Sequence, residues 1–154
     1  MTMSLVGVIL PVWGQELGTG VPMQLKGAKT YYVSGQIRGL ESSEFMVDTG
    51  SSYTTINEHS LERLLDSGGA EYLRDLTAVL ANGAELRVPL YRIAGIDLGS
   101  RCQLTGLEVA VFPGRTRQIL GLSTLRKASP FLFSVDPPQL RLSNCNRQLS
   151  LAKD

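Results

Sequence analysis

An aspartate surrounded by small residues is the part of the sequence best suited to chemistry. Asp48 follows the apolar Phe-Met-Val run of residues 45–47 and begins an Asp-Thr-Gly-Ser tetrapeptide. A carboxylate that activates water must have a fixed orientation, and the apolar run predicts a strand that delivers Asp48 into a turn. Gly50 allows a second carboxyl group to approach closely, while Thr49 and Ser51 supply hydroxyl groups that hold the geometry. Asp-Thr-Gly also occurs in plain surface turns, so the tripeptide alone does not establish a catalytic site.

The other polar side chains offer no comparable chemistry. His59 is the single histidine and is expected in the first turn of a helix, away from any nucleophile motif. Cys102 and Cys145 form no Cys-x-x-Cys pair, so we expect no metal site and no cofactor. Whether they form a disulfide in an oxidising compartment is left open by the sequence. Five further acidic residues are expected at the solvated surface: Glu41, Glu44, Asp75, Asp97 and Asp136.

Length and charge narrow the class of protein. The chain has 154 residues, 43% of them hydrophobic, which suffices for one globular domain and not for two. Fifteen basic and 14 acidic residues give a net charge of +1. A nucleic-acid partner is therefore not expected, because such proteins carry a strongly basic surface.

The N-terminal residues differ from the rest of the chain. Residues 4–13 (SLVGVILPVW) are an apolar run, interrupted by Pro11 and too short to cross a bilayer. The run is similar to the later part of a secretory signal with a cleavage position at Gly14, although no basic residue precedes it. A buried N-terminal strand is the alternative. We expect a signal-like or anchor segment plus linker in residues 1–22 and the folded domain in residues 23–154.

This division carries an expectation about location. An exported chain would be periplasmic, or anchored to the membrane and facing the periplasm, and its membrane contact would come only from the N-terminal segment. A chain that keeps residues 4–13 inside its fold would instead be cytoplasmic.

Short strands are the elements expected around Asp48. Residues 30–38 and 43–47 flank a Gly-Leu-Glu turn and predict a hairpin that leads into the Asp48 motif. Residues 57–65 predict a short helix with Asn57 as its N-cap. Asn82-Gly83, between the apolar runs 76–80 and 84–90, predicts a protruding hairpin. A second short helix is expected in residues 122–127, and further strands in 91–98, 104–112, 131–135 and 139–142.

Three features in this order resemble the retropepsin family of aspartic proteases. The tetrapeptide that begins at Asp48 follows an apolar run and is itself followed by Ile56. About 70 residues downstream, Ile119-Leu120-Gly121 precedes the short helix that contains Leu125. The Asn82-Gly83 hairpin lies between these motifs, where the family carries its flap. The resemblance covers residues 30–142 and is strongest to the bacterial single-domain branch.

The resemblance implies a mainly β protein. It would be one lobe of the acid protease fold, a retropepsin-like closed β-barrel with one or two short helices. Its flap hairpin would contain Ala81, Asn82 and Gly83, and its catalytic residue would be Asp48. The family uses two carboxyl groups and this chain holds one Asp-Thr-Gly, so the second would come from another copy across a two-fold axis.

The resemblance also implies roles for the neighbours of Asp48. Thr49 would bond to its counterpart in the second copy, Gly50 would pack at the two-fold axis, and Ser51 would hydrogen-bond the outer oxygen of Asp48. Ser51 replaces the alanine that retroviral members usually have, and the flap lacks their dense glycines. Candidate pocket residues for an extended peptide are Val79, Leu80 and Ile119, although a plain core role also accounts for each.

The expected function is therefore that of an aspartic endopeptidase acting as a homodimer on a peptide or protein substrate. Two alternatives remain. One is a peptide-binding domain that keeps the retropepsin fold without catalysis. The other is a protease whose main activity is to cut its own linker in residues 15–22.

Overall fold

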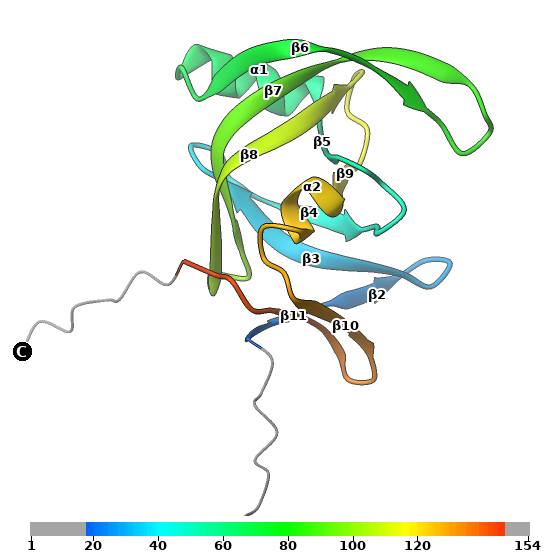
Figure 1. The fold of residues 1–154 in the computed structure, drawn as a ribbon, viewed down its shortest axis with the longest axis vertical. Coiled ribbons are helices and arrows are strands. Elements are labelled where there is room, and N and C mark those ends of the chain that lie inside the picture. Colours follow the sequence, from blue (N-terminus) through cyan, green and yellow to red (C-terminus); the bar gives the residue numbers. More distant parts are fainter. Residues whose placement is uncertain (1–17, 147–154) are drawn as a thin grey trace, which may run out of the picture.

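A closed barrel of strands forms the centre of the molecule (Figure 1). The computed structural model describes residues 18–146. The strands are β1 (Thr19–Pro22), β2 (Gln24–Lys26), β3 (Thr30–Ile37), β4 (Ser42–Val47), β5 (Thr54–Asn57), β6 (Ala70–Val79), β7 (Glu85–Leu98), β8 (Cys102–Phe112), β9 (Gln118–Leu120), β10 (Phe131–Val135) and β11 (Pro138–Leu142). The helices are α1 (Glu58–Asp66) and α2 (Leu122–Leu125).

The larger sheet closes on itself. Its strand order is β2-β3-β4-β9-β5-β8-β7-β6, and an additional pairing of β3 with β7 joins six of these strands into a ring. A separate three-stranded sheet has the order β1-β11-β10. The expected mainly β fold, with a closed barrel and two short helices, is confirmed in the described residues.

Alternation along the strands fills the barrel. In β3, Val33, Gly35 and Ile37 are buried while the residues between them are exposed, as the period of two in a strand requires. Phe45 of the neighbouring β4 is fully buried, and a Cβ atom on Gly35 would lie 2.8 Å from its ring. The absence of a side chain at Gly35 therefore makes room for the ring of Phe45.

Two parallel pairings position the ends of the central strands. β4 pairs with β9 so that Val47 lies opposite Leu120, and β5 pairs with β8 so that Asn57 lies opposite Phe112. Parallel neighbours end at the same edge of a sheet. The residues that follow β4 and β9, Asp48 and Gly121, are thereby brought together although 73 positions separate them in the chain.

The expected helix after the Asp48 motif is confirmed. The side chain of Asn57 caps α1, because its Oδ1 accepts a hydrogen bond of 2.9 Å from the Ser60 N–H. Leu61 and Leu64 are buried beneath the helix. The chain leaves the helix through Ser67, and the N–H of Gly69 donates to the Leu64 carbonyl at 2.7 Å.

The N-terminal boundary of the domain differs from the expectation. Thr19–Pro22, expected as the end of a linker, forms β1, which pairs with β11 in antiparallel register, and Val21 is fully buried. The apolar side chain of Val21 gives this segment a place in the fold, so the folded part begins before Met23. The predictions for residues 4–14 lie outside the described residues. No helix in residues 18–146 is long and apolar enough to cross a membrane.

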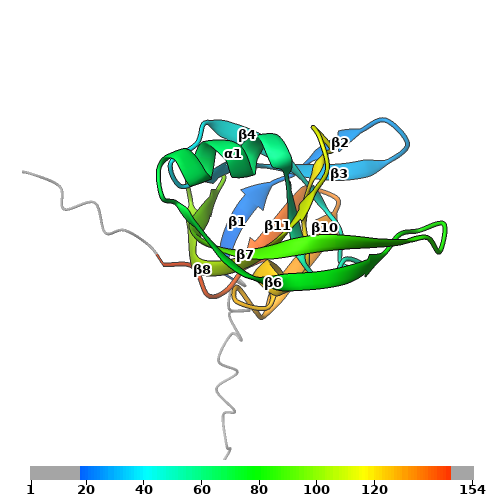
Figure 2. The same cartoon turned by 90° about the horizontal axis from the view of Figure 1, so that it is seen from above.

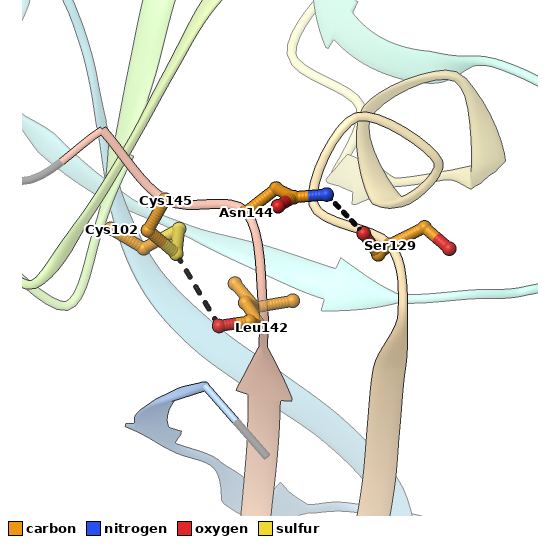
Figure 3. The surroundings of a disulfide bond; sticks show 5 residues. All are labelled: Cys102, Ser129, Leu142, Asn144 and Cys145. Carbon is orange, nitrogen blue, oxygen red and sulfur yellow. Dashed lines mark hydrogen bonds between the residues drawn. A yellow bond between two sulfur atoms is a disulfide. The ribbon is translucent and has the colours of Figure 1, made fainter.

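A disulfide joins the C-terminal segment to the barrel (Figure 3). Cys102, fully buried at the start of β8, is bonded to Cys145, which follows β11. The Asn144 side-chain amide donates to the Ser129 carbonyl beside it. The Cys145 sulfur lies 3.7 Å from the Leu142 carbonyl oxygen, a packing contact because a disulfide sulfur has no proton to donate. The two cysteines therefore form the disulfide that their spacing in the sequence left open.

Loss of this bond should destabilise the fold. The bond closes a loop of 43 residues, and removing it returns conformational entropy to the unfolded chain. We expect Cys102→Ala with Cys145→Ala to lower the free energy of unfolding by about 2–4 kcal/mol, measured by urea denaturation. A reductant should lower the midpoint of the wild type by a similar amount. It should leave the midpoint of the double variant unchanged, because that variant has no disulfide to reduce. Equal midpoints for oxidised wild type and double variant would contradict the prediction.

Candidate active site

Backbone hydrogen bonds hold Asp48 in one orientation. Its N–H donates to the Leu120 carbonyl at 3.1 Å, which ties the residue to the end of β9. Its carboxylate Oδ1 accepts from the Gly50 N–H at 2.9 Å, and its carbonyl accepts from the Ser51 N–H at 3.3 Å. The side chain is half-buried, so a fixed carboxylate is presented at the surface of the chain.

Residues 48–53, which join β4 to β5 and are called the Asp48 loop below, have an open outer edge. Thr49 and Gly50 are both exposed, as the sequence expectation of a shared two-fold contact requires. A Cβ atom on Gly50 would lie 3.1 Å from Asp48 Oδ1, tighter than an ordinary van der Waals contact. A larger residue at position 50 would therefore disturb the carboxylate itself.

Ser51 does not make the expected bond to Asp48. Its hydroxyl donates to the Tyr53 carbonyl oxygen at 2.7 Å. A serine hydroxyl has one proton, so this bond prevents donation to the carboxylate. The turn through residues 51–53 brings the Tyr53 carbonyl within hydrogen-bonding reach of this hydroxyl. Ser51 thus shapes the loop, and the Gly50 N–H is the donor that holds Asp48.

Gly121 fits against the backbone of the Asp48 loop. A Cβ atom at this position would lie 2.3 Å from the Tyr53 carbonyl oxygen and 2.9 Å from that of Ser51. Directly after it, the Leu122 N–H donates to the Ser51 carbonyl at 2.9 Å and the Ser123 N–H donates to the Ser52 carbonyl at 3.0 Å. The loop and the start of α2 are consequently in direct backbone contact.

The expected hairpin between the two motifs is formed by β6 and β7. Leu80 and Ala84 close it, with a hydrogen bond of 2.8 Å from the Leu80 N–H to the Ala84 carbonyl. Ala81, Asn82 and Gly83 lie exposed at its tip, and Gly83 has the positive φ of 82° that glycine adopts without strain. Figures 1 and 2 show the hairpin extending well beyond the barrel. In Figure 1 it extends on the side where the loop after β4 lies.

A cleft of about 360 Å³ lies between the Asp48 loop and this hairpin. It is lined by residues of both segments together with β5 and the end of β8: Gly50, Ser51, Ser52, Tyr53, Thr55, Leu76, Thr77, Ala78, Val79, Ala110 and Phe112. Of the three candidate pocket residues, Val79 lines this cleft and is 69% exposed. Leu80 is exposed near the hairpin tip, and Ile119 is half-buried in β9 opposite Met46.

Similarity to known proteins agrees with this arrangement. Residues 33–127 match the family described as "gag-polyprotein putative aspartyl protease", a range that contains Asp48, the hairpin and Gly121. The chain belongs to the retropepsin-like family. A crystal structure of a retropepsin-like aspartic protease from Rickettsia conorii has a TM-score of 0.58 and 19% sequence identity to it, covering 79% of this chain and 98% of that chain. This likeness shows the shared fold. No curated protein matches the chain significantly.

Sequence reasoning missed two buried hydroxyl groups in this retropepsin-like site. Thr54 and Thr124 are both fully buried, and the Thr54 hydroxyl donates to that of Thr124 at 2.7 Å. The same Thr54 oxygen accepts from the Gly121 N–H at 3.1 Å. Threonine in a strand is ordinary, so composition gave no signal. The only hint was that a buried polar group requires a partner, which here lies 70 positions away.

Ser123 joins three elements beside the Asp48 loop. Its hydroxyl accepts from the Thr54 N–H at 2.9 Å and donates to the Glu108 carbonyl at 3.2 Å, which links β5, α2 and β8. In residues 18–146 no cluster of three or more histidine, cysteine or acidic side chains is arranged to hold a metal ion. The group at this site that can take or give a proton is the Asp48 carboxylate, held by the Gly50 N–H.

Proposed function

We propose that the chain is an aspartic endopeptidase whose active site forms between two copies, with one Asp48 from each. The fixed orientation of Asp48 in an open loop is the observation that supports this most directly. The backbone N–H of Asp48 is bonded to Leu120 and its carboxylate to the Gly50 N–H, while the loop edge at Thr49 is exposed and able to meet its copy. Family membership supports the chemistry, and the single Asp-Thr-Gly in the sequence supports the pairing.

The reaction divides the work between the two carboxyl groups. One, ionised, takes a proton from water as the water attacks the scissile carbonyl carbon, and the other, protonated, donates to the carbonyl oxygen. The Gly50 N–H holds Oδ1 of each Asp48, and among the described residues no group hydrogen-bonds Oδ2. That oxygen is thus available for water or for the second carboxyl group.

The lining of the cleft favours a substrate with an apolar side chain beside the scissile bond. Its walls are mostly apolar, from Leu76, Ala78 and Val79 on β6 to Ala110 and Phe112 on β8. A peptide lying between the Asp48 loop and the hairpin would be extended, since main-chain hydrogen bonds to a strand or hairpin require that form. We infer that a substrate presents an extended segment with an apolar residue.

An exported location is part of the same proposal. Disulfides persist in oxidising compartments and are rare in the cytosol, and Cys102 is bonded to Cys145. This supports a periplasmic protein, with any membrane contact coming from the N-terminal residues outside the described range.

Dependence of activity on protein concentration tests the shared site. A single chain holds one Asp48, so we expect specific activity toward a peptide library to rise with concentration and then level off. Sedimentation at the same concentrations should show dimer appearing in parallel. Constant specific activity in a range where the protein sediments as a monomer would refute the shared site. A folded dimer without cleavage would favour a peptide-binding domain.

A further inference from the structure

A second hollow adjoins the peptide cleft. It has a volume of about 620 Å³ and shares Ser52 and Tyr53 with the cleft, so the two are neighbours along the outer part of the Asp48 loop. Its remaining lining comes from β7, β8 and the end of α2: Arg92, Gly106, Glu108, Ser123, Arg126 and Lys127. We call the hollow lined by these eight residues the basic groove.

The charge of the groove is unlike that of the chain. Three cationic side chains line it against one acidic residue, Glu108, whereas the whole chain is nearly neutral at +1. Arg92 is paired with Glu71 at 3.2 Å. Arg126 and Lys127 are exposed, and neither has an acidic partner within 4.0 Å among residues 18–146. The groove therefore presents positive charge that the described fold does not neutralise.

Helix stability accounts for only part of this arrangement. Cations near the end of a helix interact favourably with its last carbonyl groups, and Arg126 and Lys127 follow the four-residue α2 directly. That explanation does not extend to Arg92, which reaches the groove from β7 and is paired with Glu71. Arg126 and Lys127 are therefore the groove's cations without an acidic partner in residues 18–146, and two adjacent cations on a hollow beside the peptide cleft favour anionic groups there.

We infer that the basic groove binds acidic side chains of the peptide substrate, at positions outside the segment held in the cleft. The inference rests on the proposed protease function and adds a substrate class to it. An extended peptide advances about 3.3 Å per residue, so a chain leaving the cleft past Ser52 and Tyr53 reaches the groove within a few residues. Two copies of the chain would offer a groove at each end of a shared cleft.

Matched peptides test this inference. Two peptides share one apolar cleavage segment, and one carries three Asp or Glu residues on each side where the other carries Asn or Gln. We expect wild type to cleave the acidic peptide with a KM roughly five-fold lower, and added salt to remove the difference. Arg126→Gln with Lys127→Gln should remove the preference and leave kcat for the neutral peptide unchanged. Equal KM values for both peptides in wild type would overturn the inference and leave the protease function intact.

A binding measurement separates the inference from the protease proposal. Fluorescence anisotropy with the full chain carrying Asp48→Asn should show roughly five-fold tighter binding of the acidic peptide, lost when Arg126 and Lys127 are also replaced. Lys29→Gln with Arg63→Gln, which removes two exposed cations elsewhere, is the matched control and should keep the preference. If wild type cleaves neither peptide, this preference alone still supports the groove. If the chain carrying Asp48→Asn shows no preference for the acidic peptide, or if the control variant loses that preference, the inference is overturned.

Discussion

Asp48→Asn is expected to lower kcat for peptide hydrolysis by at least about 1,000-fold while leaving the fold intact. Asparagine has the shape of aspartate, and its Oδ1 can still accept from the Gly50 N–H, which lies 2.9 Å from the carboxylate of the wild type. It has no carboxyl group to take or give a proton, and in a dimer both groups are lost together. The measurement is the cleavage of a peptide library by wild type and variant from acidic to neutral pH.

Two controls make this result specific to Asp48. Asp66→Asn removes an exposed carboxylate at the end of α1 and should leave kcat unchanged. Mixing wild type with an equal amount of Asp48→Asn doubles the number of dimers, of which about a quarter have two aspartates if assortment is random. Mixed dimers have one aspartate and should be inactive, so total activity should fall to about half of that of the same amount of wild type alone. Hydrolysis at the wild-type rate by Asp48→Asn would exclude Asp48 as the catalytic group.

Local rules in the sequence account for the elements that were predicted well. The hairpin at Asn82-Gly83 depends on a turn that only a few residue types make, and the start of α1 depends on the side chain of Asn57 bonding three residues ahead. The hairpin of β3 and β4 follows from alternation on each side of a turn. Each of these interactions spans few residues, so the pattern that encodes it is visible in one short window of sequence.

Features that depend on distant residues were not visible in that way. The pairing of Cys102 with Cys145 and the bond between the Thr54 and Thr124 hydroxyls need the closed barrel to bring their partners together. The hydroxyl of Ser51 was expected at Asp48 because the resemblance suggested it, and the path of the loop directs it to Tyr53 instead. The motif thus indicated which segments lie together, the Asp48 turn and Gly121, whereas the fold decides which atoms they bond.

Gly121→Val is expected to lower the free energy of unfolding by at least about 4 kcal/mol and to abolish peptide cleavage. The reason is overlap and not backbone conformation, since Gly121 has a φ of −100°, which any residue adopts. Its first side-chain atom would lie 2.3 Å from the Tyr53 carbonyl oxygen, and because the crowding atoms are backbone, no side chain can turn aside to relieve the overlap. The Asp48 loop would have to move away from α2. Urea denaturation measures the loss of stability.

A glycine with the opposite constraint provides the comparison. Gly114 has a φ of +67° and open space where a Cβ atom would lie, so Gly114→Ala meets backbone strain without overlap and should cost only about 1 kcal/mol. Gly121→Ala, with the single atom that overlaps, should fall between Gly114→Ala and Gly121→Val. If Gly121→Ala and Gly114→Ala are equally stable, close backbone packing at Gly121 does not hold the loop in place. The position of Asp48 would then depend on the hydrogen bonds that join the loop to its neighbours. These are the backbone bonds from Asp48 to Leu120 and from Leu122 and Ser123 to the loop carbonyls, together with the side-chain bonds of Thr54 and Ser123 at the end of the loop.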